Sequence, residues 1–265
     1  ERAAAVPVHG TLVLSITTSQ GRMVCADRRR YDPVLGEQDV VTKIGAMEGG
    51  VVVASVGAAI IDERRVDARG AVTLGSALFN ATEVSVRFSR TRRFVDEASY
   101  WSALVTAVAA DLRQALVNRP LMAGDSQPQF QSLYYWRRPD GQPRQYAFAI
   151  EYAATNQVRI ISAGYGQTLS DDSLLVNSAG DPYVFAEVVS GSDRRFDDLR
   201  RDAEIRRFLL ERTRRADVAS SEARQFARRF MRISSERTKE LAADAHIGPT
   251  SDCLSVDAAG VHAAP

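Results

Sequence analysis

Three polar residues near the start of the chain could together carry out nucleophilic chemistry: Thr11, Asp27 and Lys43. A threonine hydroxyl is a weak nucleophile at neutral pH. If Thr11 becomes the first residue, however, its own α-amine, with a reference pKa of about 8, can act as the base. The Lys43 ammonium would then stabilise the developing alkoxide. A buried carboxylate at Asp27 would keep that lysine charged, since a lone buried ammonium tends to lose its proton.

Backbone N–H groups where a strand turns into a helix would hold the oxyanion, and Gly57, which closes the apolar run 51–56, is expected at such a junction. Other enzyme signatures are missing: the sequence has no G-x-S-x-G, H-E-x-x-H, C-x-x-C or Walker motif. Its three histidines all lie near the ends of the sequence, so a Ser-His-Asp triad or a histidine-rich metal site has no support. We expect neither a metal nor an organic cofactor.

Composition is that of an ordinary globular protein of one domain or at most two, with 265 residues, 45% of them hydrophobic and 25% charged. A formal net charge of +1 gives no reason to expect nucleic acid or a membrane surface as a partner. No run of eighteen apolar residues is present, so a membrane-spanning helix is not expected. Cys25 and Cys253 both lie in apolar strand-like contexts, where two buried thiols are favoured over a disulfide.

The first element that would position these residues is a hairpin, with strands predicted over 11–16 and 23–27. Alternation along its first strand sends Thr11, Val13 and Ser15 to one face and Leu12, Leu14 and Ile16 to the other. Further on, the spacing predicts a broken helix over 58–80, a solvated hairpin or edge strand over 84–94 and an amphipathic helix over 96–118.

In the second half of the chain, the apolar pattern and the turn residues predict antiparallel strands over 133–136, 146–152 and 158–161, with a short strand over 174–176. A helix over 182–189 follows, then two helices within 196–243 broken near 216–221, and a last strand over 253–256. This order predicts a layered α+β domain rather than a regular βαβ alternation.

The first part of the chain resembles the N-terminal region of proteasome β-subunits, the threonine-peptidase branch of the N-terminal nucleophile hydrolases. The matching positions, in type and in spacing, are Thr11, Gly21, Ala26-Asp27-Arg28-Arg29, Lys43-Ile44 and Gly57. In that family glycine commonly precedes the threonine and the leader is removed by self-cleavage, which Gly10 fits.

The resemblance implies a four-layer αββα sandwich of the N-terminal nucleophile hydrolase type, with residues 1–10 as a leader and 11–265 as one domain. It adds Ser178 and Asp244 to the catalytic set of Thr11, Asp27, Lys43 and Gly57, although Ile247 stands where the family usually has a serine. It also implies a substrate pocket of unassigned specificity. The expected pocket residues are Arg30, Val41, Gly45, Ser55, Ala59 and Glu63.

The expected function is therefore that of a bacterial threonine peptidase that acts on unfolded or short peptides after cleavage of Gly10–Thr11. By resemblance it would form a homo-oligomeric ring or a related assembly, with an unfoldase as a candidate partner. Two alternatives are a non-catalytic structural subunit and an amidase of the same fold acting on a small molecule. A cytoplasmic location is expected, with the periplasm or secretion as the alternative if an upstream signal peptide has been removed.

Overall fold

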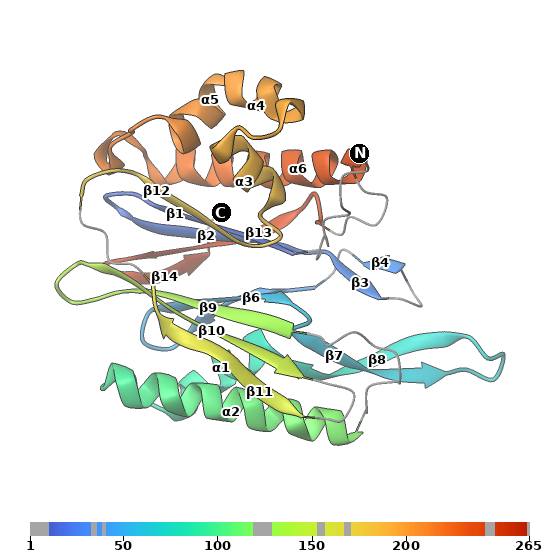
Figure 1. Cartoon of the computed structure of the whole chain (residues 1–265). Coiled ribbons are helices and arrows are strands. Elements are labelled where there is room, and N and C mark those ends of the chain that lie inside the picture. The colour runs from blue at the N-terminus through green and yellow to red at the C-terminus, as the bar shows by residue number, and fades with distance from the viewer. Residues whose placement is uncertain are drawn as a thin grey trace.

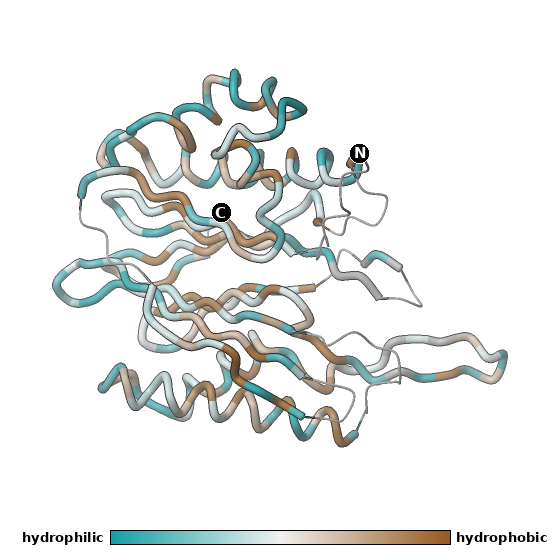
Figure 2. The backbone as a smooth tube through the Cα atoms, viewed as in Figure 1, coloured by the Kyte–Doolittle hydropathy of each residue, from teal (hydrophilic) through white to brown (hydrophobic). Residues whose placement is uncertain are grey.

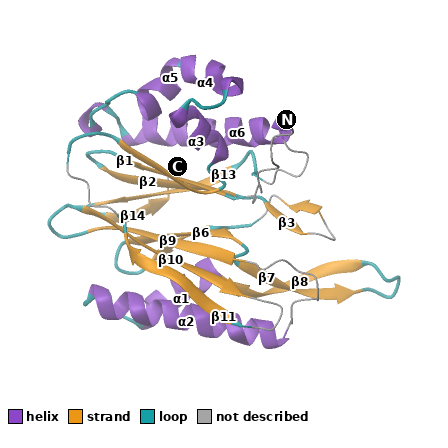
Figure 3. Ribbon diagram, in the orientation of Figure 1, coloured by secondary structure: helices purple, strands orange, loops and turns teal. Residues whose placement is uncertain are grey.

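A computed structural model describes residues 11–32, 36–38, 41–118, 129–152, 157–166, 171–241 and 247–263. Two five-stranded sheets, antiparallel throughout, form its centre (Figure 1; Figure 3). The first sheet has the order β12 (Leu175–Gly180), β1 (Leu12–Thr17), β2 (Gly21–Asp27), β13 (Ser251–Asp257), β14 (Gly260–Ala263). The second has the order β11 (Val158–Tyr165), β10 (Pro143–Tyr152), β9 (Gln129–Arg137), β6 (Val51–Gly57), β5 (Ile44–Met47).

Helices lie outside both sheets (Figure 1). On the first sheet these are α3 (Tyr183–Ser190), α4 (Asp197–Arg201), α5 (Ala203–Ile205) and α6 (Ser220–Leu241). Two short 3-10 helices, η1 (Arg194–Phe196) and η3 (Arg215–Asp217), and a short π-helix, η2 (Arg206–Leu210), lie between them. On the second sheet they are α1 (Ala81–Thr91) and α2 (Glu97–Asn118). None of the helices in these described ranges is long and apolar enough to cross a membrane.

Two smaller hairpins complete the described part. One consists of β3 (Arg30–Asp32) and β4 (Gly36–Gln38), and the other of β7 (Ile60–Val66) and β8 (Val72–Asn80), which projects from the body. Hydropathy follows this layout, because brown stretches gather on the central strands and the tip of the β7–β8 hairpin is teal (Figure 2).

The alternation predicted along β1 is confirmed by its packing. Leu12, Leu14 and Ile16 belong to the apolar cluster between the first sheet and its helices. Val13, in contrast, packs between the two sheets with residues such as Val24. Both faces of β1 are therefore buried, and the intersheet face carries Thr11 at one end and Thr17 at the other.

The predicted mixture of helices with antiparallel sheets is confirmed, and so are the helix over 96–118 and the strands between 133 and 161. The broken helix over 58–80 is wrong, because this segment forms the β7–β8 hairpin. β-Branched residues on both of its strands, such as Ile60 and Thr73, favour extended backbone.

The solvated hairpin over 84–94 is also wrong, because helix α1 occupies this segment. Asn80 begins the helix by accepting hydrogen bonds from the backbone N–H groups of Thr82 and Glu83. The first of the two helices expected within 196–243 is replaced by the short pieces from η1 to η3.

Buried free thiols are likewise a wrong prediction. Cys25 of β2 and Cys253 of β13 stand directly opposite each other in the sheet, 4.1 Å apart at Cα, and form a disulfide. The sequence could not show this pairing, because the two cysteines are 228 residues apart and β2 meets β13 only in the folded sheet.

Replacing both cysteines, Cys25→Ala with Cys253→Ala, should lower the free energy of unfolding by about 2–5 kcal/mol, because the closed loop that restricts the unfolded chain is lost. Urea unfolding of the oxidised protein and the double variant measures the difference. Alkylation of both thiols in the untreated wild-type protein, before any reduction, would contradict the pairing.

Candidate active site

Thr11, Asp27 and Lys43 meet at one end of the sheet sandwich. Thr11 stands just before β1, Asp27 ends β2 and Lys43 immediately precedes β5 of the other sheet. The Lys43 Nζ donates a hydrogen bond of 2.9 Å to Thr11 Oγ1 and bonds of 3.3 and 3.2 Å to the two carboxylate oxygens of Asp27. All three side chains are buried, with 4%, 0% and 6% of their surface exposed. The sequence thus predicted which residues lie together.

Asp27 connects several parts of the chain as well as binding the lysine. Its Oδ1 accepts from the N–H of Leu12 at 2.8 Å, and its Oδ2 accepts from the N–H groups of Arg29 and Gly248, each at 3.1 Å. Burial raises the pKa of Asp27, and the Lys43 charge together with the backbone N–H donors opposes that rise. A carboxylate with this many donors is a fixed part of the site.

Sequence reasoning missed two groups that complete the surroundings of Lys43. The carbonyl oxygen of Arg29 also accepts a hydrogen bond from Lys43 Nζ. Thr82 Oγ1 lies within hydrogen-bond distance of both the Lys43 carbonyl oxygen, at 3.3 Å, and Ser55 Oγ, at 3.0 Å. No side-chain signal in the sequence could reveal a backbone acceptor, and Thr82 reaches the site only because α1 packs on β5 and β6.

A second missed feature is the turn after β12, which fixes the position of Thr11. The N–H of Asp181 donates to the Thr11 carbonyl at 2.7 Å. Gly180 adopts φ +93°, and a Cβ at this position would lie 1.9 Å from the same oxygen. The backbone at Thr11 therefore requires glycine at position 180, and the Gly180-Asp181-Pro182 sequence was the available signal for a turn there.

The other expected catalytic residues are placed differently. Ser178 pairs with Leu14 across β12 and β1, and no hydrogen bond joins its side chain to Thr11 in the part of the chain that the structure describes. Asp244 lies outside the described residues. Gly57 ends β6 with φ +81° and is exposed, but the chain continues into β7 rather than into a helix. The expected strand-to-helix junction at Gly57 is therefore wrong.

The six residues expected to form a substrate pocket fall into several environments. Ser55 is buried and its hydroxyl lies within hydrogen-bond distance of Thr82 and Ser132, while Ala59 packs in the core under α1 and α2.

Glu63 lies on the β7–β8 hairpin in an ion pair with Arg65 at 2.7 Å. Val41 and Gly45 flank Lys43 in sequence, and the side chain of Arg30 is outside the described part. The pocket stays a prediction.

No group of three or more histidine, cysteine or acidic side chains suited to a metal ion occurs within the described ranges. The arrangement instead offers a hydroxyl beside a buried ammonium, the chemistry expected of an assisted oxygen nucleophile.

Comparison with known proteins gives a distant structural likeness only. No family model and no curated protein sequence matches the chain. Among solved structures, Anbu from Hyphomicrobium sp. strain MC1 and its Gly-1 mutant match at 12% and 13% identity, each with a TM-score of 0.45. The matches cover 93% and 94% of this chain and 82% of each Anbu chain.

The comparisons overturn the assignment to the proteasome β-subunits. No model of that family matches, and the two Anbu structures share only 12% and 13% identity with the chain. The residues of the chain's own candidate site are therefore the evidence for its function.

The Gly180 contact generates a direct test. Gly180→Ala should lower the free energy of unfolding by about 3 kcal/mol or more, because the methyl group adds a clash with the Thr11 carbonyl to the strain of a positive φ. Gly70→Ala is the matched control, since Gly70 has φ +80° with nothing within 4 Å of its added Cβ. It should cost about 1 kcal/mol, from the strain alone. Equal losses in urea unfolding would contradict the close approach.

Proposed function

We propose that the chain is a hydrolase of the N-terminal nucleophile type, in which Thr11 attacks a peptide carbonyl after the Gly10–Thr11 bond is cut. The observation that carries this proposal is the 2.9 Å hydrogen bond from the buried Lys43 ammonium to Thr11 Oγ1. The order of helices, sheet, sheet and helices also supports it, because the αββα sandwich of this hydrolase type has the same order.

In the proposed reaction the free α-amine of Thr11 takes the hydroxyl proton as Oγ1 bonds to the substrate carbonyl carbon. The Lys43 ammonium stabilises the charge that develops on Oγ1, and Asp27 keeps the ammonium charged in its buried position. The carbon–nitrogen bond then breaks, and the amine returns the proton to the leaving group. Water hydrolyses the ester that remains and restores the threonine hydroxyl. The backbone N–H of the exposed Gly57 is the proposed donor to the oxyanion.

The disulfide bears on the compartment. Disulfides persist mainly in oxidising surroundings, so Cys25–Cys253 favours the periplasmic or secreted alternative over the cytoplasm. We further propose that the chain assembles into a homo-oligomer.

Thr11→Ala should reduce hydrolysis of peptide reporters by about a thousandfold or more, since the attacking atom is lost. Thr11→Ser should keep measurable activity, because it retains a hydroxyl and the α-amine. Thr106→Ala on α2, where the hydroxyl donates to the Ser102 carbonyl within the same helix, is a control that should act like wild type. Full activity of Thr11→Ala would rule out the proposal.

Intact-mass measurement on protein from its native host shows whether Gly10–Thr11 is cut. If residues 1–10 persist in the working form, Thr11 has an amide instead of an amine, and a non-catalytic structural role is favoured. Activity on small acyl amides but not on peptides would instead favour the amidase alternative with the same nucleophile.

A further inference from the structure

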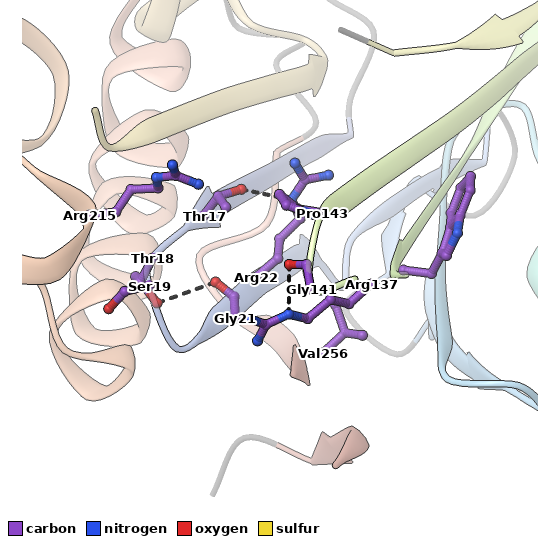
Figure 4. A pocket seen from close by; sticks show the side chains of 11 residues that line it. Thr17, Thr18, Ser19, Gly21, Arg22, Arg137, Gly141, Pro143, Arg215 and Val256 are labelled. Atoms are coloured by element: carbon purple, nitrogen blue, oxygen red, sulfur yellow. Dashed lines mark hydrogen bonds between the residues drawn. The ribbon is translucent and has the colours of Figure 1, made fainter. Parts of the chain in front are cut away.

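A small cavity of about 60 Å³ lies at the other end of β1 from Thr11, beside the turn that joins β1 to β2. Three arginines from separate elements line it: Arg22 of β2, Arg137 of β9 and Arg215 of η3 (Figure 4). Thr17 and Thr18 also line the cavity. The cavity therefore gathers positive charge from both sheets and from the outer layer.

Arg22 is the unusual member, because its side chain is only 4% exposed and no carboxylate pairs with it in the described part of the chain. Its Nε donates to Thr17 Oγ1 at 2.7 Å and its Nη1 to the Arg144 carbonyl at 3.4 Å. The guanidinium also lies over the Tyr135 ring, 5.2 Å from its centroid. Burial lowers the pKa of Arg22, as expected for a buried cation without a counter-charge.

These contacts use only part of the hydrogen-bonding capacity of Arg22. A guanidinium has five N–H donors and no acceptor, and the two hydrogen bonds of Arg22 go to neutral oxygens. Burying a charge costs several kcal/mol unless an opposite charge and hydrogen bonds compensate for it. An anion in the cavity would provide both.

The positive charges of the other two arginines, Arg137 and Arg215, are compensated little or not at all by nearby carboxylates. Arg137 donates to the carbonyl oxygens of Gly141 at 2.8 Å and Gln20 at 3.3 Å, both neutral. Arg215 donates to a backbone carbonyl and meets one carboxylate, that of Asp172 at 3.4 Å, which is almost fully exposed to solvent. An exposed carboxylate at that distance contributes little compensation.

We propose that this cavity is a binding site for a small oxyanion of the phosphate type, either the free ion or the phosphate group of a larger molecule. The forked guanidinium suits two oxygens of one phosphate, and the Thr17 hydroxyl, which accepts from Arg22 Nε, can donate its own hydrogen to another. A water molecule needs roughly 10–15 Å³, so the cavity has room for a few waters or for one such anion. The bound ion would join β2, β9 and η3 and stabilise the folded state.

The probe is inorganic phosphate, up to about 50 mM at constant ionic strength, with the melting temperature as the readout. We expect a saturable rise. Arg137→Gln and Arg215→Gln should each weaken the fitted affinity about tenfold or more, the factor expected for losing one charged hydrogen bond. The control is Arg159→Gln on β11, a surface arginine that pairs with Glu151 and does not line the cavity, and this change should leave the affinity unchanged.

An equal rise in all variants, or one that never saturates, would be a general salt effect and would overturn the site. Glycerol 2-phosphate in place of phosphate distinguishes the two sources of the group. If it binds with the same dependence on Arg137 and Arg215, the cavity accepts the phosphate of a larger molecule, and if only inorganic phosphate binds, the ligand is the free ion. The Thr11→Ala variant should bind phosphate as wild type does, which separates this site from the proposed nucleophile.

Discussion

The position of the buried Lys43 ammonium is the constraint on which the candidate site depends. A charged lysine is stable inside a protein only when an opposite charge and hydrogen-bond acceptors surround it. Here the acceptors come from Asp27, from the Arg29 carbonyl and from the Thr11 hydroxyl. One of these acceptors is the candidate nucleophile. The contacts that stabilise the buried ammonium therefore also hold it beside the Thr11 hydroxyl.

Asp27 extends this constraint to the backbone. Its carboxylate holds the N–H of Leu12 at the start of β1 and that of Gly248, just before β13. On the opposite side of Thr11, Asp181 and Gly180 fix its carbonyl. Strands β12, β1, β2 and β13, which are neighbours in the first sheet, are thereby tied together at the end where the nucleophile lies. The ends of four strands therefore meet at the site.

How far the sequence predicts this arrangement depends on the range of the interaction concerned. Thr11, Asp27 and Lys43 could be found because each has a chemical reason to meet the others. The β1 pattern could be found because alternation is local. The segments 58–80 and 84–94 were interchanged, since their apolar spacing suits helix and strand alike, and the Asn80 cap and tertiary packing decide between them.

Longer-range features could not be predicted at all. The Cys25–Cys253 bond depends on β2 lying beside β13, and the Arg29 carbonyl contact depends on the path of the chain after β2. The close approach of Gly180 to Thr11 likewise exists only because β12 pairs with β1. Each of these depends on how segments far apart in the sequence come together in the fold, which no local pattern encodes.

A buried cation lies at each end of β1, and the two cations are stabilised in different ways. Each end of the sheet sandwich buries a cation beside a threonine hydroxyl: Lys43 beside Thr11, and Arg22 beside Thr17. Lys43 has its counter-charge within the protein, in Asp27, whereas Arg22 has only neutral acceptors and an aromatic ring among the described residues. A buried cation without an internal partner is a cost to folding that an external anion would remove. The contrast with Lys43 is therefore the physical reason to look for a ligand at Arg22 and for a reaction at Thr11.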